Sequence, residues 1–135
     1  MIEINNFTKF VVDKKLFSAV AKKVLLGENR GTQTLSLALV NKEEIKKLNK
    51  EFRKKDKPTD VLSFELKERN IIGEIIICPD VVAENAKKDN VSIKSEMLKV
   101  FVHGILHLCG YDHEKSEREA VEMETKQEKY LSEIK

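Results

Sequence analysis

The sequence predicts an α+β domain: a small mixed β-sheet of about four strands, packed with about five helices around one central buried helix. Two observations lead to this class. Short segments with alternating apolar residues are interspersed with segments whose apolar residues recur every three or four positions. The segment that ends near Cys109 is apolar on nearly all sides, which is typical of a buried helix. A length of 135 residues suits a single domain, 1–135, with one core.

Four segments have the character of strands, at residues 1–5, 34–40, 61–66 and 71–77. The clearest alternation places Leu35, Leu37 and Leu39 on one face, which predicts a strand that is buried on one side. The last two segments are close enough in sequence to pair as a hairpin. A sheet that contains such a hairpin, with helices between its other strands, is mixed.

Five helices are predicted, at residues 13–25, 41–52, 79–89, 92–109 and from 116 onward. Asn41 and Ser92 are residue types that favour the N-cap position, where a side-chain oxygen accepts a backbone N–H. In the second helix Ile45, Leu48 and Phe52 form an apolar stripe, which predicts that all three are buried. Residues 53–60 read as a polar loop.

All three histidines of the chain lie in one segment of eleven residues, HGILHLCGYDH. His103 and His107 are four residues apart, so both project from one face of a helix. His113 could not join them on a continuing helix. Gly110 resolves this, because glycine tolerates a left-handed conformation and commonly ends helices. Three imidazoles leave one position open on a tetrahedral ion, as in catalytic zinc sites. The sequence thus predicts one zinc ion per chain on the central helix, although nickel or another divalent ion also suits imidazole.

Gly104 separates this segment from a familiar peptidase signature. The spacing HxxxHxxGxxH matches the metzincin peptidases, which have a glutamate as general base at the position of Gly104. Glycine cannot accept a proton, so a peptidase is disfavoured. The alternative interpretation is three unrelated histidines with hydrogen-bond partners, but it does not explain why the chain has none elsewhere.

Charge and composition restrict the partners less sharply. The net charge of +2 is too small to establish a nucleic-acid partner. A basic stretch includes Lys54, Lys55 and Lys57, and it either attracts phosphate groups or forms a solvated surface. No aromatic residues interleave with these lysines to stack bases. Both interpretations stay open.

We expect a cytoplasmic protein without a membrane partner. The first ten residues contain no long apolar run of a signal peptide, and no segment approaches the length of a membrane span. Cys78 and Cys109 are far apart in sequence and sit beside apolar residues. Without a secretory signal they are interpreted as buried thiols in a reducing compartment.

The histidine segment, together with LNKEFR at 48–53 and PTDVLSF at 58–64, resembles the YbeY family of metal-dependent endoribonucleases. The resemblance covers nearly the whole chain, and Gly104 is normal for that family. Two positions depart from the family pattern. Glu65 stands where the family often has proline, and Glu74 stands where it usually has aspartate.

This resemblance implies that His103, His107 and His113 bind zinc and that Arg53 acts across a cleft from the metal. A guanidinium can grip two oxygens of a phosphoryl group on which charge builds up. Three candidates for proton transfer stay open: a metal hydroxide, Asp112, and the 2′-hydroxyl of the RNA. Asp112 could equally orient a ligand histidine, and this second role is favoured.

The leading hypothesis from this resemblance is a single-strand-specific, metal-dependent endoribonuclease. It would act in ribosomal RNA processing, at the 3′ end of 16S rRNA, and in ribosome quality control. Its partners would be single-stranded ribosomal RNA, contacted by Lys54, Lys55 and Lys57, and the small ribosomal subunit or its assembly factors. One alternative is a zinc hydrolase of another substrate class. The other is a ribosome-assembly factor without enzymatic activity, in which the metal is structural.

Overall fold

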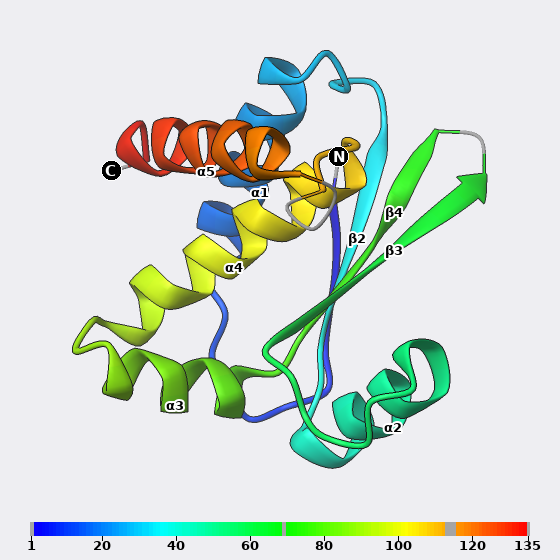
Figure 1. Cartoon of the computed structure of the whole chain (residues 1–135), viewed down its shortest axis with the longest axis vertical. Helices are drawn as coiled ribbons and strands as arrows, with labels where there is room; N and C mark the ends of the chain where they lie inside the picture. The colour runs from blue at the N-terminus through cyan, green and yellow to red at the C-terminus, as the bar shows by residue number, and fades with distance from the viewer. Residues whose placement is uncertain (1, 69, 113–115, 135) are drawn as a thin grey trace.

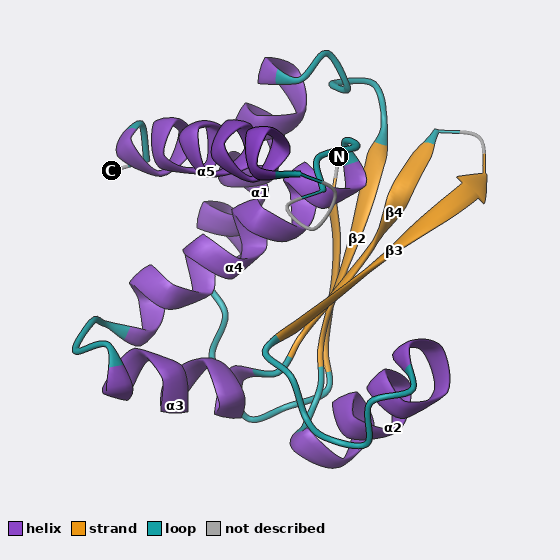
Figure 2. Ribbon diagram, viewed as in Figure 1, coloured by secondary structure: helices purple, strands orange, loops and turns teal. Residues whose placement is uncertain are grey.

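The computed structural model describes residues 2–68, 70–112 and 116–134. Within these ranges the chain forms four strands and five helices, which confirms the α+β prediction (Figures 1 and 2). In chain order they are β1 (Ile2–Asn6), α1 (Lys14–Gly27), β2 (Thr34–Leu39), α2 (Lys42–Arg53), β3 (Val61–Glu68), β4 (Ile71–Ile77), α3 (Pro79–Lys88), α4 (Ile93–Leu108) and α5 (Glu117–Ser132). None of these helices combines the length and the apolar character that a bilayer crossing requires.

The four strands form one mixed sheet in the order β1-β2-β4-β3. β1 pairs with β2, and β2 with β4, in parallel, whereas β3 and β4 form the predicted antiparallel hairpin. In the register of the sheet Ile75 lies between Leu37 on one side and Ser63 on the other. The hairpin therefore places β3 at one edge of the sheet, where its outer side borders the candidate site.

Helices cover the two faces of the sheet unequally. Figure 1 shows α1, α4 and α5 stacked on one side, with α2 alone on the other. The larger core lies under the stack, where α4 is buried on nearly all sides and contributes Phe101 and Ile105, each 0% exposed. A smaller apolar cluster lies under α2 and includes Ile45, Ala38 and Ile76. The second face of β2 is thus covered too, and the prediction of a strand buried on one side was wrong.

α2 differs from its predicted form at one important position. Ile45 and Asn49 face the sheet and are 0% and 2% exposed, whereas Phe52 is 59% exposed. The prediction that Phe52 is buried was wrong, because the side chain that continues the inner face is a polar one. Nδ2 of Asn49 donates to the carbonyl oxygen of Lys57, 2.9 Å away, whereas its buried Oδ1 has no hydrogen-bond partner among the described residues. Arg53 is also the last residue of α2, rather than the first of a loop.

The two cysteines are free thiols. Cys78 is buried as predicted, but Cys109 is only partly buried, because it caps the end of α4. Burial raises the pKa of the Cys109 thiol to about 11 and also raises the pKa of Cys78. Both side chains therefore stay protonated at neutral pH and are poor nucleophiles.

Candidate active site

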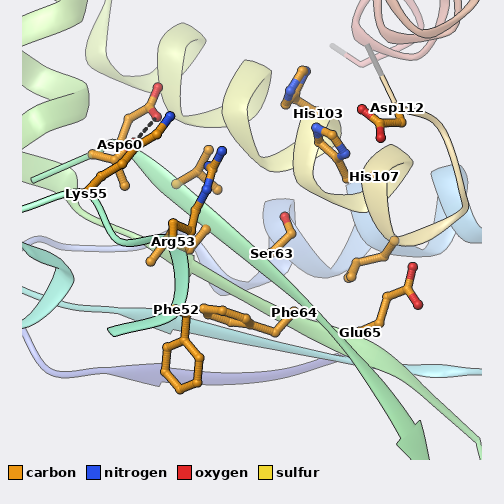
Figure 3. Close-up of a pocket in the computed structure, with 14 residues that line it drawn as sticks. Phe52, Arg53, Lys55, Asp60, Ser63, Phe64, Glu65, His103, His107 and Asp112 are labelled. Atoms are coloured by element: carbon orange, nitrogen blue, oxygen red, sulfur yellow. Dashed lines mark hydrogen bonds between the residues drawn. The ribbon is translucent and has the colours of Figure 1, made fainter. Parts of the chain in front are cut away.

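α4 carries a pair of histidines that face a cleft, which is lined by residues of α4, β3 and the end of α2. Ser92 caps the start of the helix, where its side chain accepts the backbone N–H of Ser95, and the apolar residues of α4 hold it in the larger core. His103 and His107 lie one turn apart on the face that this packing leaves toward the cleft (Figure 3). Their ring centroids are 4.9 Å apart, with the ring planes at 77°. The one-turn spacing in the sequence thus places both imidazoles side by side.

Gly104 faces the sheet and not the cleft. A Cβ at this position would lie 3.1 Å from the Cδ1 atom of Ile75 and 3.2 Å from Oγ of Ser63. The same approach allows the Ser63 hydroxyl to donate to the carbonyl oxygen of Gly104, at 3.5 Å. A side chain at position 104 would press against Ile75 and Ser63, which would have to shift by a few tenths of an ångström. The close packing of α4 on β3 and β4 therefore explains physically why this chain has glycine here.

Gln127 of α5 fixes the orientation of one histidine ring. Its Oε1 lies 2.9 Å from Nδ1 of His103. An amide oxygen can only accept, so Nδ1 carries the hydrogen and the lone pair of the ring is on Nε2. Histidines that bind metals characteristically donate their other ring N–H to an oxygen in this way. Sequence reasoning missed Gln127. A signal was present, since this polar residue lies four positions after Met123 and three before Tyr130, both buried.

The end of α4 is a tight left-handed turn. Gly110 has a φ of 106°, which confirms the predicted left-handed turn at this glycine. The N–H of Gly110 donates to the carbonyl oxygen of His107, and the N–H of Tyr111 donates to that of Leu106. This pair of bonds is the Schellman arrangement that ends many helices. The turn sends the chain back along the cleft, so that Asp112 lines it beside the histidines (Figure 3).

Glu28, directly after α1, stabilises this turn by a hydrogen bond to Tyr111. Its carboxylate accepts the Tyr111 hydroxyl at 2.8 Å and the Tyr130 hydroxyl of α5, and Lys126 lies 3.4 Å away. The side chain of Glu28 is only 8% exposed. Burial alone would raise its pKa, but the two phenol hydrogen bonds and the charge of Lys126 outweigh burial, so that the pKa of Glu28 is lowered. Burial and the bond to Glu28 raise the pKa of Tyr111 to about 12, which keeps this phenol a donor.

The opposite wall of the cleft comes from the end of α2 and the loop after it. Arg53 points from this wall toward the histidine helix, with the polar side chain of Ser63 between them (Figure 3). The cleft has a volume of about 720 Å³ and joins residues from α2, β3, α4 and the turns beside them. Its lining residues are Phe52, Arg53, Lys55, Thr59, Asp60, Val61, Leu62, Ser63, Phe64, Glu65, His103, His107, Leu108 and Asp112.

The predicted site residues are therefore distributed as follows. Arg53, Lys55, Asp112 and the pair formed by His103 and His107 line one cleft. Lys54 and Lys57 are exposed and are not among the lining residues. Lys54 has instead the left-handed conformation that ends α2.

The third predicted ligand, His113, lies outside the described residues. Within residues 2–68, 70–112 and 116–134, no three histidine, cysteine or acidic side chains form a group that could hold a metal ion. The donors that are described nevertheless fit one. Two imidazoles that bind a tetrahedral ion through nitrogens about 2.0–2.1 Å away have ring centres about 5 Å apart. The observed 4.9 Å between His103 and His107 agrees with this value, and Gln127 supports the tautomer that presents Nε2.

The fold and the cleft define a class: an α+β protein with a histidine helix on one side of its candidate active site and an arginine on the other. Comparison with known proteins makes the class specific. The family model described as endoribonuclease YbeY matches residues 3–135. The chain belongs to the YbeY family.

Individual relatives agree with this assignment. The endoribonuclease YbeY of Thermotoga petrophila is 46% identical over 123 residues, which cover 91% of this chain and 78% of the relative. The protein of the same name from Bdellovibrio bacteriovorus is 42% identical and covers 76% of this chain and 67% of its own length. The solution structure of TM1509 from Thermotoga maritima is 42% identical, with a TM-score of 0.73, and the match covers 99% of this chain and 89% of that one.

Proposed function

We propose that this chain is a metal-dependent endoribonuclease that cleaves single-stranded RNA during the processing of ribosomal RNA. One observation carries the proposal: the histidine pair of α4 and Arg53 of α2 line the same cleft from opposite walls. The name endoribonuclease, which the relatives share, supports the same reaction class. The physiological partners would be ribosomal RNA and the small ribosomal subunit or its assembly factors, in the cytoplasm.

In this proposal His103, His107 and His113 hold one divalent ion, most simply zinc. A bound ion of this kind supplies Lewis acidity toward a phosphoryl group or an attacking water. The protein contributes the orientation of the ligands. Gln127 holds the ring of His103 in the tautomer that presents Nε2, and the Schellman turn at Gly110 returns the chain toward the cleft.

Arg53 would bind the scissile phosphoryl group. Cleavage of a phosphodiester builds negative charge on the equatorial oxygens, and the planar guanidinium can donate to two of them at once. Arg53 ends α2, where the helix is held on the sheet by Ile45 and Asn49. Its position across from the histidines lets it grip the phosphoryl group from the side opposite to the ion.

Asp112 lines the cleft next to the histidines and has two possible tasks. It can hold a proton from the attacking group, or it can orient a ligand histidine. The second task is the one that we propose, since oxygen partners of ligand histidines commonly set their tautomer. The attacking group would then be water or the 2′-hydroxyl of the RNA itself. A DNA oligonucleotide, which has no 2′-hydroxyl, separates these two possibilities.

The test is cleavage of a single-stranded RNA oligonucleotide by highly purified protein, with and without a chelator. We expect cleavage that the chelator abolishes and added zinc restores. The Arg53→Ala variant, purified identically, should retain its metal and its melting temperature but cleave at least about 100-fold more slowly. Equal cleavage by this variant would reveal a contaminating ribonuclease or a wrong assignment of the site. Cleavage that is insensitive to the chelator would reject the metal dependence.

A further inference from the structure

Phe52 is an exposed aromatic residue on the wall of the cleft. The side chain is 59% exposed, whereas Ile45 and Asn49 of the same helix are buried. It follows directly before Arg53, and both residues line the cleft. Other large exposed apolar residues, such as Phe7 and Val11, do not. Exposure of a single phenylalanine needs no explanation in general. Exposure beside the arginine of the candidate active site calls for one.

Phe64 of β3 supports the ring of Phe52 from the side. The two ring centroids lie 5.2 Å apart with an interplanar angle of 64°, an edge-to-face pair. Phe64 itself is partly buried and packs against the smaller cluster under α2. Figure 3 shows the two rings together at one end of the cleft, away from the histidines. The pair therefore offers a supported aromatic surface rather than a loose side chain.

Positive charge lies next to this aromatic surface. Arg53 and Lys55 line the same cleft, and Lys54 is exposed between them in the sequence. Proteins that bind single strands combine these two features, because cations track the phosphates while aromatic rings stack the bases. In the sequence no aromatic residue lies among Lys54, Lys55 and Lys57, although Phe52 directly precedes Arg53. The structure brings Phe64 from the next strand to Phe52 and so creates the combination.

We propose that Phe52, supported by Phe64, is a stacking platform for one unpaired base of the RNA, next to the phosphoryl group that Arg53 binds. This inference rests on the proposed function. It also gives a physical reason for a preference for single strands. Bases in a duplex are stacked on their neighbours and cannot lie on a protein ring, whereas unpaired bases can be splayed out onto one.

The test measures RNA binding to protein from which metal has been removed, so that the readout does not require cleavage. The probe is a fluorescent single-stranded RNA of mixed sequence. Phe52→Ala should weaken binding by about 5-fold to 150-fold, the range found when an aromatic residue that stacks one base is removed. Phe52→Leu keeps an apolar side chain of similar bulk and should weaken binding nearly as much. Phe52→Tyr should bind like the wild type, and Phe7→Ala serves as the matched exposed control.

An abasic scan identifies the base. RNAs that lack one base at successive positions should show one position where the missing base weakens binding to the wild type but not to Phe52→Ala. Binding of Phe52→Leu that equals the wild type would overturn the proposal, because apolar contact alone would suffice. A penalty for every abasic position that is the same in both proteins would overturn it too. Failure of the wild type to cleave any RNA would instead count against the proposed function, since the binding assay is independent of cleavage.

Discussion

The two walls of the cleft are supported by apolar clusters of very different size. The histidine wall is the central helix α4, whose neighbours α1, α5 and the sheet surround it with the larger core. The arginine wall is the end of α2, which rests on the smaller cluster and on the bond from Asn49 to the loop carbonyl of Lys57. Arg53 and Phe52 project from it as exposed side chains.

This difference suggests a division of tasks. As metal ligands, the role proposed for them, the histidines would have to keep their geometry, and a buried helix with the supporting contacts of Gln127 and Glu28 holds them in place. A substrate as long and variable as RNA needs side chains that can adapt to it, and exposed residues on a lightly packed helix end can move more freely. Changes in the two walls should therefore have separable effects.

The largest effects should come from the two residues that define the walls. His107→Ala should reduce the bound metal from about one ion per chain to nearly none, and it should abolish cleavage. Arg53→Ala should keep the metal and the melting temperature but lower the rate by about 100- to 1,000-fold, as the loss of one stabilising donor does. Elemental analysis and single-turnover cleavage measure both quantities. Equal metal content in wild type and His107→Ala would contradict the assignment of the α4 histidines as metal ligands.

Arg53→Lys separates geometry from charge on the arginine wall. Lysine keeps the positive charge but cannot make a planar contact to two oxygens. We expect a rate near that of Arg53→Ala. A rate near that of the wild type would mean that Arg53 supplies charge alone.

Two tyrosines allow the support of the histidine wall to be tested with a matched pair. Tyr111 in the turn and Tyr130 in α5 donate to the same carboxylate of Glu28. Replacing either by phenylalanine should cost about 1.5–3 kcal/mol of unfolding free energy, the usual value for a hydrogen bond to a charged group. Only Tyr111→Phe should also weaken metal binding, because only Tyr111 belongs to the turn before His113. Equal affinities for zinc in the two variants would show that Glu28 stabilises the fold but does not position the site.

The stabilisation that Glu28 gives to the fold should depend on pH, because it requires the ionised carboxylate. Its folded-state pKa is lowered from an ordinary value of 4.5. A carboxylate of this kind stabilises the fold fully above pH 4.5 and loses that contribution as the pH falls through the folded-state pKa. The difference in stability between wild type and Glu28→Gln, measured by urea unfolding, should therefore shrink below pH 4.5. The stabilisation that is lost in acid should be part of the roughly 1.5–3 kcal/mol that a hydrogen bond to a charged group contributes. A difference that does not vary between neutral pH and acid would mean that folding does not lower the pKa of Glu28.

The elements of the fold were predictable because their signals are local. The alternation at Leu35, Leu37 and Leu39 reflects the two faces of a strand, and the caps at Asn41 and Ser92 are residue types with a direct physical role. The turn at Gly110 followed from the requirement that the chain reverse after His107. In each case the physical cause lies within a few residues of the sequence that shows it.

The predictions that were wrong or missed depend instead on contacts between separate parts of the chain. Whether Phe52 is buried depends on how far the sheet extends under α2, and the burial of Asn49 depends on a carbonyl eight residues away. Glu28 meets Tyr111 across 83 positions of the sequence, and Gln127 meets His103 across 24. No periodicity within one element identifies such pairs, because the packing of separate helices creates them.

A smaller effect is expected at the turn itself. Gly110 has a φ of 106°, where a side chain strains the backbone, yet apart from Gly110 and its chain neighbours no atom of the described residues lies within 4 Å of the position of a Cβ. Gly110→Ala should therefore cost on the order of 1 kcal/mol from backbone strain, without a steric clash. Metal affinity should fall with it, because the strained turn shifts the segment that leads to His113. Thermal unfolding and a zinc competition assay test this, and unchanged values in both would show that the turn accepts alanine.

The smallest effects should come from the lysines around the arginine wall. Each phosphate contact on a single strand contributes about 0.7 to the slope of log K against log salt concentration. Lys55 lines the cleft, whereas Lys54 and Lys57 are exposed outside its lining. Lys55→Gln should therefore reduce the magnitude of this slope by about 0.7. Replacement of Lys54 or Lys57 by glutamine should reduce it by less. Lys22→Gln, at an exposed position of α1, is the control and should leave the slope unchanged. Equal slopes for all four variants and the wild type would mean that RNA is held on this wall by Arg53 and the aromatic pair, without help from the basic loop.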